Sequence, residues 1–128
     1  MSEPMKTHGA FSWCELLTSD ATAAIAFYGK LFGWQTREMP MGDGTYNVVS
    51  IAGQDAAGIM KTPPAAAGQP PFWGVYVTVN DVDATAEQAK KLGGKVLMGP
   101  MDIPNVGRFC TLQDPQGAVI SAITYAGG

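Results

Sequence analysis

A β-hairpin is predicted by the stretch GRFCTLQ-DPQG-AVISAITY, which occupies residues 107–125. Its two arms are rich in strand formers, and the four residues between them are turn formers. Pro115 presets the backbone of the first central turn position, Asp114 can accept a hydrogen bond from the backbone two residues on, and Gly117 tolerates positive φ. This hairpin is the end of a pattern that occurs twice in the chain.

Length and composition predict one globular domain. A chain of 128 residues buries enough surface to form a core without disulfides, and Cys14 and Cys110 have neither metal-type nor redox-type spacing. The net charge is -3 with Lys and Arg scattered singly, no apolar run is long enough to span a bilayer, and no signal peptide opens the sequence. We therefore expect a cytoplasmic protein that binds neither nucleic acid nor membranes.

The first half of the chain has the order β-α-β-β-β. Residues 18–20 offer several helix N-caps, and Gly33 is suited to ending the helix. The helix should turn one apolar face to the core, formed by Ala24, Phe27, Tyr28 and Leu31. The predicted strands are 11–17, 34–40, 46–51 and 56–60, with a turn at 42–44.

The second half repeats this order after a connector at 61–71 that contains four prolines and should have little structure of its own. Asn80 and Asp81 precede the helix, and its expected inward face consists of Val82, Thr85, Ala86, Ala89 and Leu92. The predicted strands are 72–79, 95–98, 108–113 and 118–125, with a mobile loop at 101–106.

The two halves match at a fixed offset of 61 residues, which places residue 72 on residue 11. The matching pairs include Asp20 with Asp81, Leu31 with Leu92, and Gly33 with Gly94. The sequence therefore predicts an α+β fold made of two tandem β-α-β-β-β modules, 10–60 and 72–125, within a single domain at 10–125.

Four motifs carry a resemblance to a known family. They are Ala26-Phe27-Tyr28 before Leu31-Phe32-Gly33-Trp34, then Asn80-Asp81-Val82-Asp83, Leu92-Gly93-Gly94 and Asp114-Pro115-Gln116-Gly117. In this order they resemble the vicinal oxygen chelate superfamily, which includes glyoxalase I, bleomycin-resistance proteins, fosfomycin-resistance enzymes and extradiol dioxygenases. The resemblance implies a curved mixed sheet around a ligand cavity, and subunits that commonly pair as dimers.

Catalytic members of this family hold a divalent metal at fixed strand positions. The resemblance places these on Trp13, Gly74, Ser121, and Ile59 or Met60. None offers the imidazole, carboxylate or thiolate donors that such ions need. A shift of one residue would bring in Cys14 but would turn the strand inside out, and His8 lies before the first strand, where it should be solvated. We expect no metal and no cofactor.

Strand alternation then predicts what lines the cavity. If the family's ligand positions face inward, so do the side chains that share their faces, and the expected ligand-binding residues are Trp13, Glu15, Met60, Gly74, Tyr76, Arg108 and Ser121. Leu17, Thr78 and Ile123 share these faces, Cys110 is an alternative to Arg108, and Val75, Val77 and Val79 should pack under the helices.

Glu15 and Tyr76 match at the 61-residue offset and are the expected catalytic pair. A desolvated carboxylate can act as a base while a phenol stabilises negative charge that develops on an oxygen. The structural alternative is that Glu15 pairs with Arg108 or only forms a hydrogen bond with Tyr76.

Two functional classes remain open, with a third behind them. The first is a metal-independent binder of a small organic ligand, in the manner of bleomycin-resistance proteins, with an apolar, aromatic cup. The second is an enzyme, either a metal-dependent lyase or dioxygenase with atypical ligands or a metal-free isomerase that uses Glu15 and Tyr76. The third is a protein-interaction module with a closed cup. A homodimer is expected, and the connector permits either a closed monomer or exchange of modules between subunits.

Overall fold

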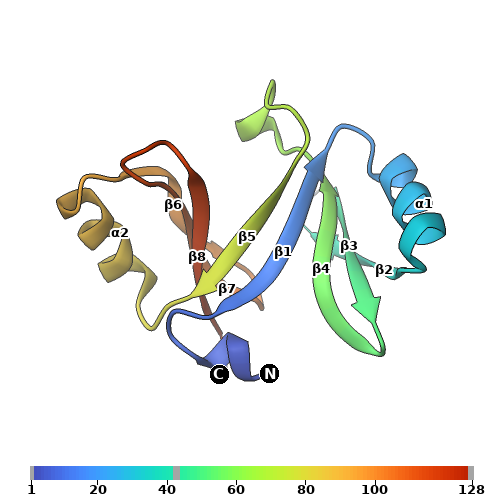
Figure 1. Cartoon of the computed structure of the whole chain (residues 1–128), viewed down its shortest axis with the longest axis horizontal. Helices are drawn as coiled ribbons and strands as arrows, with labels where there is room; N and C mark the ends of the chain where they lie inside the picture. Colours follow the sequence, from blue (N-terminus) through green and yellow to red (C-terminus); the bar gives the residue numbers. More distant parts are fainter. Residues whose placement is uncertain (1, 42–43, 127–128) are drawn as a thin grey trace. The chain divides into compact units, whose positions relative to one another are not determined.

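A computed structural model describes residues 2–41 and 44–126 of the chain (Figure 1). Its elements are η1 (Glu3–Lys6), β1 (Phe11–Thr18), α1 (Ala21–Phe32), β2 (Gln35–Met41), β3 (Gly44–Ile51), β4 (Gln54–Lys61), η2 (Pro64–Ala66), β5 (Phe72–Thr78), α2 (Val82–Lys91), β6 (Lys95–Ile103), β7 (Gly107–Gln113) and β8 (Val119–Tyr125). Gly42 and Asp43 of the predicted turn at 42–44 lie outside the described residues.

The chain divides into two compact units, the first Trp13–Gly74 and the second Met1–Ser12 with Val75–Gly128. In the first unit the strand order is β2-β3-β4-β1, with β1 parallel to β4. In the second it is β5-β8-β7-β6, with β5 parallel to β8. The predicted α+β class, the repeated β-α-β-β-β order and the mixed strand directions are confirmed, while the cavity stays a prediction.

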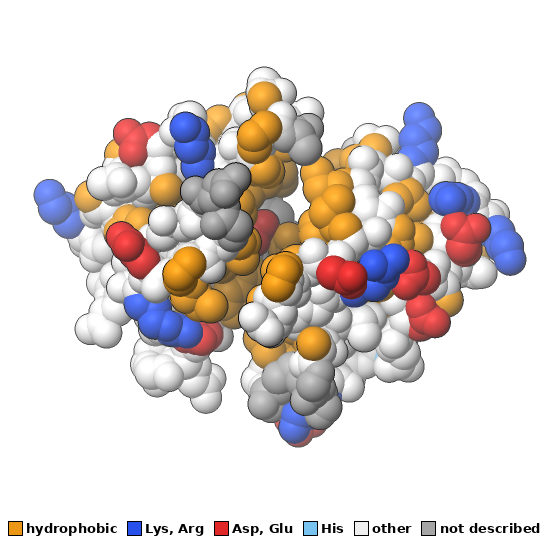
Figure 2. Space-filling model, turned by 180° about the vertical axis from the view of Figure 1, so that it is seen from behind, with side chains coloured by type: hydrophobic (Ala, Val, Ile, Leu, Met, Phe, Trp, Pro, Cys, Tyr) orange, Lys and Arg blue, Asp and Glu red, His pale blue; other side chains and the backbone are white. Residues whose placement is uncertain are grey.

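Charged groups of both signs are interspersed on the face of the molecule drawn in Figure 2. Charged side chains of the described residues also form ion pairs, such as Arg37 with Asp55 at 2.6 Å and Lys90 with Glu87 at 2.9 Å. Within 2–41 and 44–126, none of the helices is long and apolar enough to cross a membrane.

The core of the first unit lies between α1 and its strands. Leu16 of β1 and Ile59 of β4 are neighbours in the parallel ladder, and both are buried with Val49 and Ala57. The residues packed against this cluster are Ala21, Ala24, Ile25, Tyr28 and Trp34. Because side chains alternate along a strand, the burial of Leu16 under α1 turns its neighbour Glu15 to the opposite face.

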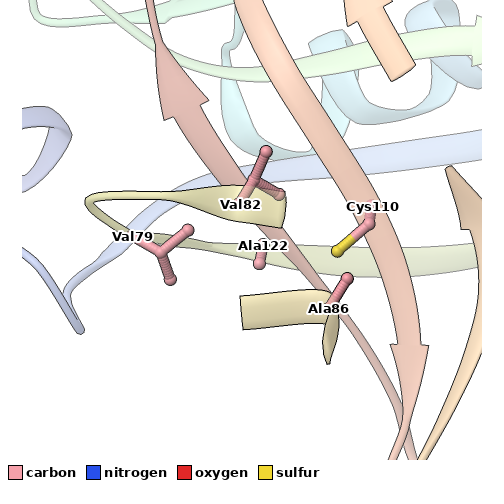
Figure 3. Close-up of a cluster of buried hydrophobic side chains, with 5 residues drawn as sticks. All are labelled: Val79, Val82, Ala86, Cys110 and Ala122. Atoms are coloured by element: carbon pink, nitrogen blue, oxygen red, sulfur yellow. The ribbon is translucent and has the colours of Figure 1, made fainter. Parts of the chain in front are cut away.

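The core of the second unit lies between α2 and its strands (Figure 3). Val79, Val82, Ala86, Cys110 and Ala122 converge there from four different parts of the chain. Val77 packs against the same cluster, so two of the three valines predicted to lie under the helix do so. Burying such apolar side chains is the main contribution to stability, about 1.5–3 kcal/mol for a valine.

The helix faces differ in part from those predicted. Phe27 and Leu31 were expected in the core, but their exposed fractions are 60% and 57%. Positions 21, 24, 25 and 28 form the stripe that contacts the strands. At 100° per residue position 27 lies outside this stripe, whereas position 31 lies at its edge, in the last turn of the helix. Leu92, the match of Leu31, is also exposed.

The predicted caps and turn are present. Asp20 accepts a hydrogen bond from the Ala23 N–H at 3.0 Å, and Asp81 accepts one from Ala84 at 3.1 Å. Asp114 accepts from the Gln116 N–H at 2.9 Å, which is the bond expected in the hairpin turn.

Two segments are more ordered than the sequence suggested. Residues 101–103 of the predicted loop continue β6, which has register shifts against β7. His8 is exposed, as expected, and also accepts a hydrogen bond through Nδ1 from the Asn80 N–H at 2.9 Å. The hydroxyl of Thr78 also donates to the Pro4 carbonyl at 2.7 Å, so the segment before β1 is held against the second unit.

Candidate functional site

Three polar side chains form a hydrogen-bonded chain in the first unit. The Trp13 Nε1–H donates to the Tyr46 hydroxyl oxygen at 2.8 Å, and the Tyr46 hydroxyl donates to the Glu15 Oε2, also at 2.8 Å. Tyr46 is 7% exposed, and Trp13 and Glu15 are half-buried. We call these three residues the Trp13–Tyr46–Glu15 chain.

Gly58 of β4 makes this arrangement possible. It lies between Glu15 of β1 and Val48 of β3 in the strand ladders. A Cβ atom built at Gly58 would overlap the ring and the hydroxyl of Tyr46. The phenol therefore crosses over the backbone of β4 to reach Glu15, and a glycine in a strand commonly marks such a close approach.

The direction of the hydrogen bonds defines the chemistry of the chain. A phenol that donates to a carboxylate forms a charge-assisted hydrogen bond, which is shorter and stronger than a bond between two neutral groups. The Trp13 indole N–H donates to the Tyr46 hydroxyl oxygen and so fixes the position of the phenol ring. The hydroxyl hydrogen of Tyr46 is then directed at Glu15. The result is an oriented acceptor beside two aromatic rings on the face opposite α1.

Two other predicted residues belong to the same unit. Met60 pairs with Leu17 in the ladder, two positions from the pair formed by Gly58 and Glu15, and so shares their face. A Cβ built at Gly74 would lie 3.9 Å from the backbone oxygen of Glu15. Met60 and Gly74 therefore lie in the neighbourhood of the Trp13–Tyr46–Glu15 chain.

Tyr76 and Ser121 lie in the second unit, where they are direct neighbours on β5 and β8. The Ser121 hydroxyl is 3.0 Å from that of Thr111, and the Tyr76 ring centroid is 6.2 Å from that of Phe109. These residues occupy the face opposite α2. Since Glu15 and Tyr76 belong to different units, each described by itself, their catalytic pairing stays a prediction.

Arg108 lies on the other face of the second unit. It shares a strand face with the buried Cys110, two residues further on, and so lies on the α2 side. There it donates to Asp83 through Nε at 2.9 Å and Nη2 at 3.0 Å, and to Asp102 through Nη1 at 3.2 Å. These bonds raise the pKa of the guanidinium and lower that of Asp83. The prediction had placed Arg108 among the ligand-binding residues, but the structure places it beside the helix.

A separate groove lies on the α1 side of the first unit. Its lining consists of Ala21, Thr22, Ile25, Thr36, Glu38, Gly44, Thr45, Asn47 and Lys61. The amide of Asn47 donates to the Ile59 carbonyl at 3.0 Å. This lining includes none of the three members of the Trp13–Tyr46–Glu15 chain.

Tyr46 and Gly58 are the site residues that sequence reasoning missed. Both fell within predicted strands, but neither was assigned a role. An isolated glycine inside a strand is a signal of close backbone approach. Tyr46 reaches Gly58 only because of the register between β3 and β4, and that register includes a shift between Val49 and Ser50.

The Trp13–Tyr46–Glu15 chain carries a single carboxylate, fewer donors than a divalent metal needs. Among residues 2–41 and 44–126, no three His, Cys, Asp or Glu side chains come together in a way that could hold such an ion. The resemblance placed the family's ligand positions on Trp13, Gly74, Ser121, and Ile59 or Met60, and that assignment stays a prediction. The expected absence of a metal cofactor stays a prediction that metal analysis would test.

Comparison with known proteins identifies the family. Residues 10–121 match the model of the Glyoxalase/Bleomycin resistance protein/Dioxygenase superfamily. That match covers nearly all of the chain, so the chain belongs to this superfamily, as the motifs indicated.

Curated relatives share about a third or more of their aligned residues with the chain. The "Putative glyoxylase CFP32" of Mycobacterium bovis is 39% identical over 115 residues, which cover 88% of this chain and 44% of that protein. The "Anthracycline biosynthesis protein DauV" of Streptomyces sp. is 35% identical over 126 residues, which cover 88% of this chain and 46% of that protein. The chain thus spans about half the length of the curated relatives it matches.

Solved structures support the fold alone. A methylmalonyl-CoA epimerase of Streptomyces coelicolor superposes with a TM-score of 0.69 at 17% identity, covering 94% of this chain and 97% of that chain. The Mycobacterium tuberculosis epimerase has a TM-score of 0.65 at 16% identity, covering 90% and 86%.

Proposed function

We propose that the chain binds a small organic ligand on the face of the first unit that carries the Trp13–Tyr46–Glu15 chain. The single observation behind this proposal is the Tyr46 hydroxyl held at 2.8 Å from both Trp13 Nε1 and Glu15 Oε2. Small-molecule sites typically combine aromatic walls with a few oriented polar groups. Here the rings supply the wall and the Glu15 carboxylate supplies the acceptor.

The ligand we infer is planar and apolar, with at least one hydrogen-bond donor. A flat ring system can stack on Trp13, and a hydroxyl or amine can donate to Glu15. The relative named as an anthracycline biosynthesis protein makes an anthracycline the first probe, since it joins a planar aromatic system to polar substituents.

The test is titration of the protein with an anthracycline by isothermal calorimetry. Tyr46→Phe should weaken binding about tenfold, because it removes the hydroxyl that donates to Glu15 and holds the carboxylate in its orientation. Tyr28→Phe is the matched control, since Tyr28 also accepts an indole N–H, from Trp73 at 3.1 Å. Equal affinity in the wild type, Tyr46→Phe and Trp13→Ala would contradict the proposed site.

An enzyme is the second candidate, and the short contact between carboxylate and phenol favours it. A metal-free isomerase would use Glu15 to take a proton from carbon beside a ligand carbonyl and to return it at the end of the reaction. The phenol predicted for this step is Tyr76, which would donate to the oxygen on which negative charge develops, because the single O–H of Tyr46 is donated to Glu15. A metal-dependent lyase or dioxygenase with atypical ligands is the other form of this alternative.

Proton exchange separates binding from isomerisation. The bound probe would be incubated with protein in D2O, and its mass would be followed over time. Deuterium uptake that depends on protein and is lost in Glu15→Gln would favour the enzyme, whereas binding without uptake would favour the binder.

A further inference from the structure

The groove on the α1 side of the first unit, here called the α1 groove, is built on a row of three paired residues. Glu38 of β2 pairs with Asn47 of β3, and Asn47 pairs with Ile59 of β4. Ile59 is buried under α1, and directly paired residues point to the same face of a sheet. The groove has a volume of about 530 Å³, within the range of small-molecule sites.

Asn47 presents an oriented acceptor to the α1 groove. It is only 6% exposed, and its Nδ2 donates to the Ile59 carbonyl at 3.0 Å. A carbonyl oxygen can only accept, so this bond directs the amide oxygen Oδ1 away from Ile59. Among residues 2–41 and 44–126, nothing donates to this oxygen, and no fully buried side-chain oxygen or nitrogen lacks a partner. The Asn47 oxygen is therefore open to the groove that this residue lines.

Glu38 places a negative charge beside this acceptor. It lies next to Asn47 in the ladder and also lines the groove. Among the described residues Glu38 takes part in no ion pair, whereas Asp55 in the same unit is held by Arg37. An ammonium group has three donors and no acceptor. The Asn47 oxygen and the Glu38 carboxylate together fit such a group.

The other end of the α1 groove is positive. Lys61 follows Ile59 by two residues on β4 and so points to the same side of the sheet, and no ion pair within the described part of the chain involves it. Lys61 pairs with Thr18, the last residue of β1, and α1 begins three residues later at Ala21. The N-terminus of α1, which carries a partial positive charge, therefore lies at the Lys61 end.

The distance between the two ends restricts the ligand. Lys61 lies two residues further along β4 than the row of Asn47, which corresponds to about 7 Å along the strand. Ala21 and Ile25 of α1 add apolar surface to the lining between them. A free amino acid is too short to reach both ends, whereas the terminal charges of an extended dipeptide are about 6 Å apart.

We propose that the α1 groove is a second binding site, which takes a small zwitterion of the dipeptide class. Its ammonium group binds Asn47 and Glu38, its carboxylate binds Lys61 and the N-terminus of α1, and an apolar side chain contacts Ile25. This site lies on the face of the sheet opposite the Trp13–Tyr46–Glu15 chain, so it is independent of the function proposed for that chain.

The test is a titration of 15N-labelled protein with alanyl-leucine, followed by NMR. Saturable shifts should be centred on the amides of Ala21, Asn47 and Lys61, with a Kd below about 10 mM. N-acetyl-alanyl-leucine lacks the ammonium group and alanyl-leucinamide lacks the carboxylate. Each should bind at least about tenfold more weakly, because one charged end of the groove stays unmatched. Leucine, whose charges are too close together, should also bind more weakly.

Two exposed substitutions test the ends of the α1 groove separately. Lys61→Met and Glu38→Gln should each weaken binding of alanyl-leucine at least about fivefold, because each removes one charge that the ligand meets. Lys30→Met is the matched control, since Lys30 is an exposed lysine of α1 outside the groove lining, and its affinity should equal that of the wild type. The dispersion of the NMR spectrum verifies that each variant is folded.

Three results would overturn the proposal. They are the absence of saturable shifts up to about 10 mM alanyl-leucine, equal binding of the peptide and its two capped analogues, and unchanged affinity in both Lys61→Met and Glu38→Gln. Shifts confined to the Trp13 indole N–H and its neighbours would assign the dipeptide to the opposite face of the sheet and would overturn it as well.

Discussion

The phenol of Tyr46 occupies the space that a side chain at position 58 would fill. Gly58 of β4 pairs with Glu15 of β1 on one side and with Val48 of β3 on the other. The Tyr46 ring crosses directly over Gly58. The absence of a side chain at Gly58 and the position of the Glu15 carboxylate are therefore parts of one arrangement.

Gly58→Ala should displace the Tyr46 ring and lower the free energy of unfolding by about 1–3 kcal/mol, because overpacking forces neighbours to move. Urea denaturation measures the change. Gly29→Ala is the control, since a Cβ at Gly29 would lie 3.6 Å from the Trp34 carbonyl oxygen, an ordinary contact. Inside helix α1 it should be neutral or stabilising by up to about 1 kcal/mol.

Tyr46→Ala should largely remove the penalty of Gly58→Ala. With the ring gone, the added methyl group has room, so the two effects should not add. A double-mutant cycle by urea denaturation gives the coupling energy, which we expect to exceed about 1 kcal/mol. Additive effects would mean that Gly58 is constrained by the backbone and not by Tyr46.

Tyr46→Phe should lower the free energy of unfolding by about 1–3 kcal/mol, because Trp13 loses its acceptor and Glu15 loses a donor. The emission of Trp13 should shift as its N–H finds a new partner or solvent. Tyr28→Phe removes a longer bond, 3.1 Å from Trp73, at a more exposed position, and should have the smaller effect. Equal effects of the two substitutions would contradict the special position of Tyr46.

Local signals in the sequence were sufficient to predict the order of elements. Asp20 and Asp81 cap their helices as predicted, and Asp114 forms the hairpin turn, because each acts through backbone groups only two or three residues away. Alternation along β1 likewise assigned Leu16 and Glu15 to opposite faces correctly.

The features of the fold and the site that were not predicted depend on contacts between segments far apart in the sequence. The orientation of α1 could not be read from its composition, since the helix has apolar residues on both sides and Phe27 looked as suitable for the core as Ile25. Arg108 was assigned to the ligand face as a residue of the strand that pairs with the last one. Its contact with Asp83, 25 residues away on α2, could not be predicted from sequence spacing.

Asp83→Asn should reduce the pH dependence of stability. The hydrogen bonds from Arg108 lower the pKa of Asp83 below its ordinary value of 3.8, so the folded state binds this proton less readily than the unfolded state. The stabilisation is therefore present above pH 3.8 and is lost as the pH falls through the lowered value. Because the pair is exposed, the Tm at pH 7 should fall by only about 1–2 °C.

Thermal melts of Asp83→Asn and wild type at pH 7 and pH 2 would measure this difference. The variant should melt lower at pH 7, and its deficit should shrink towards pH 2, because the charge of folded Asp83 is lost as the pH falls through its lowered pKa. Asp102→Asn serves as a graded comparison, since Asp102 accepts a single bond at 3.2 Å, and its effect should be smaller. A deficit that persists at pH 2 would indicate a packing effect of the substitution.

The two thiols should differ in reactivity by at least about 100-fold, since a buried thiol reacts only when the structure opens. Cys14 is exposed, whereas Cys110 is fully buried between α2 and β8, and desolvation raises the pKa of Cys110. At pH 8 a disulfide reagent such as dithiobis(nitrobenzoate) should therefore modify one thiol rapidly.

Cys14→Ser should abolish the fast phase and Cys110→Ala should leave it unchanged. The slow phase should accelerate in urea as opening of the second unit becomes more frequent, and two fast thiols in native protein would contradict the packing of Cys110.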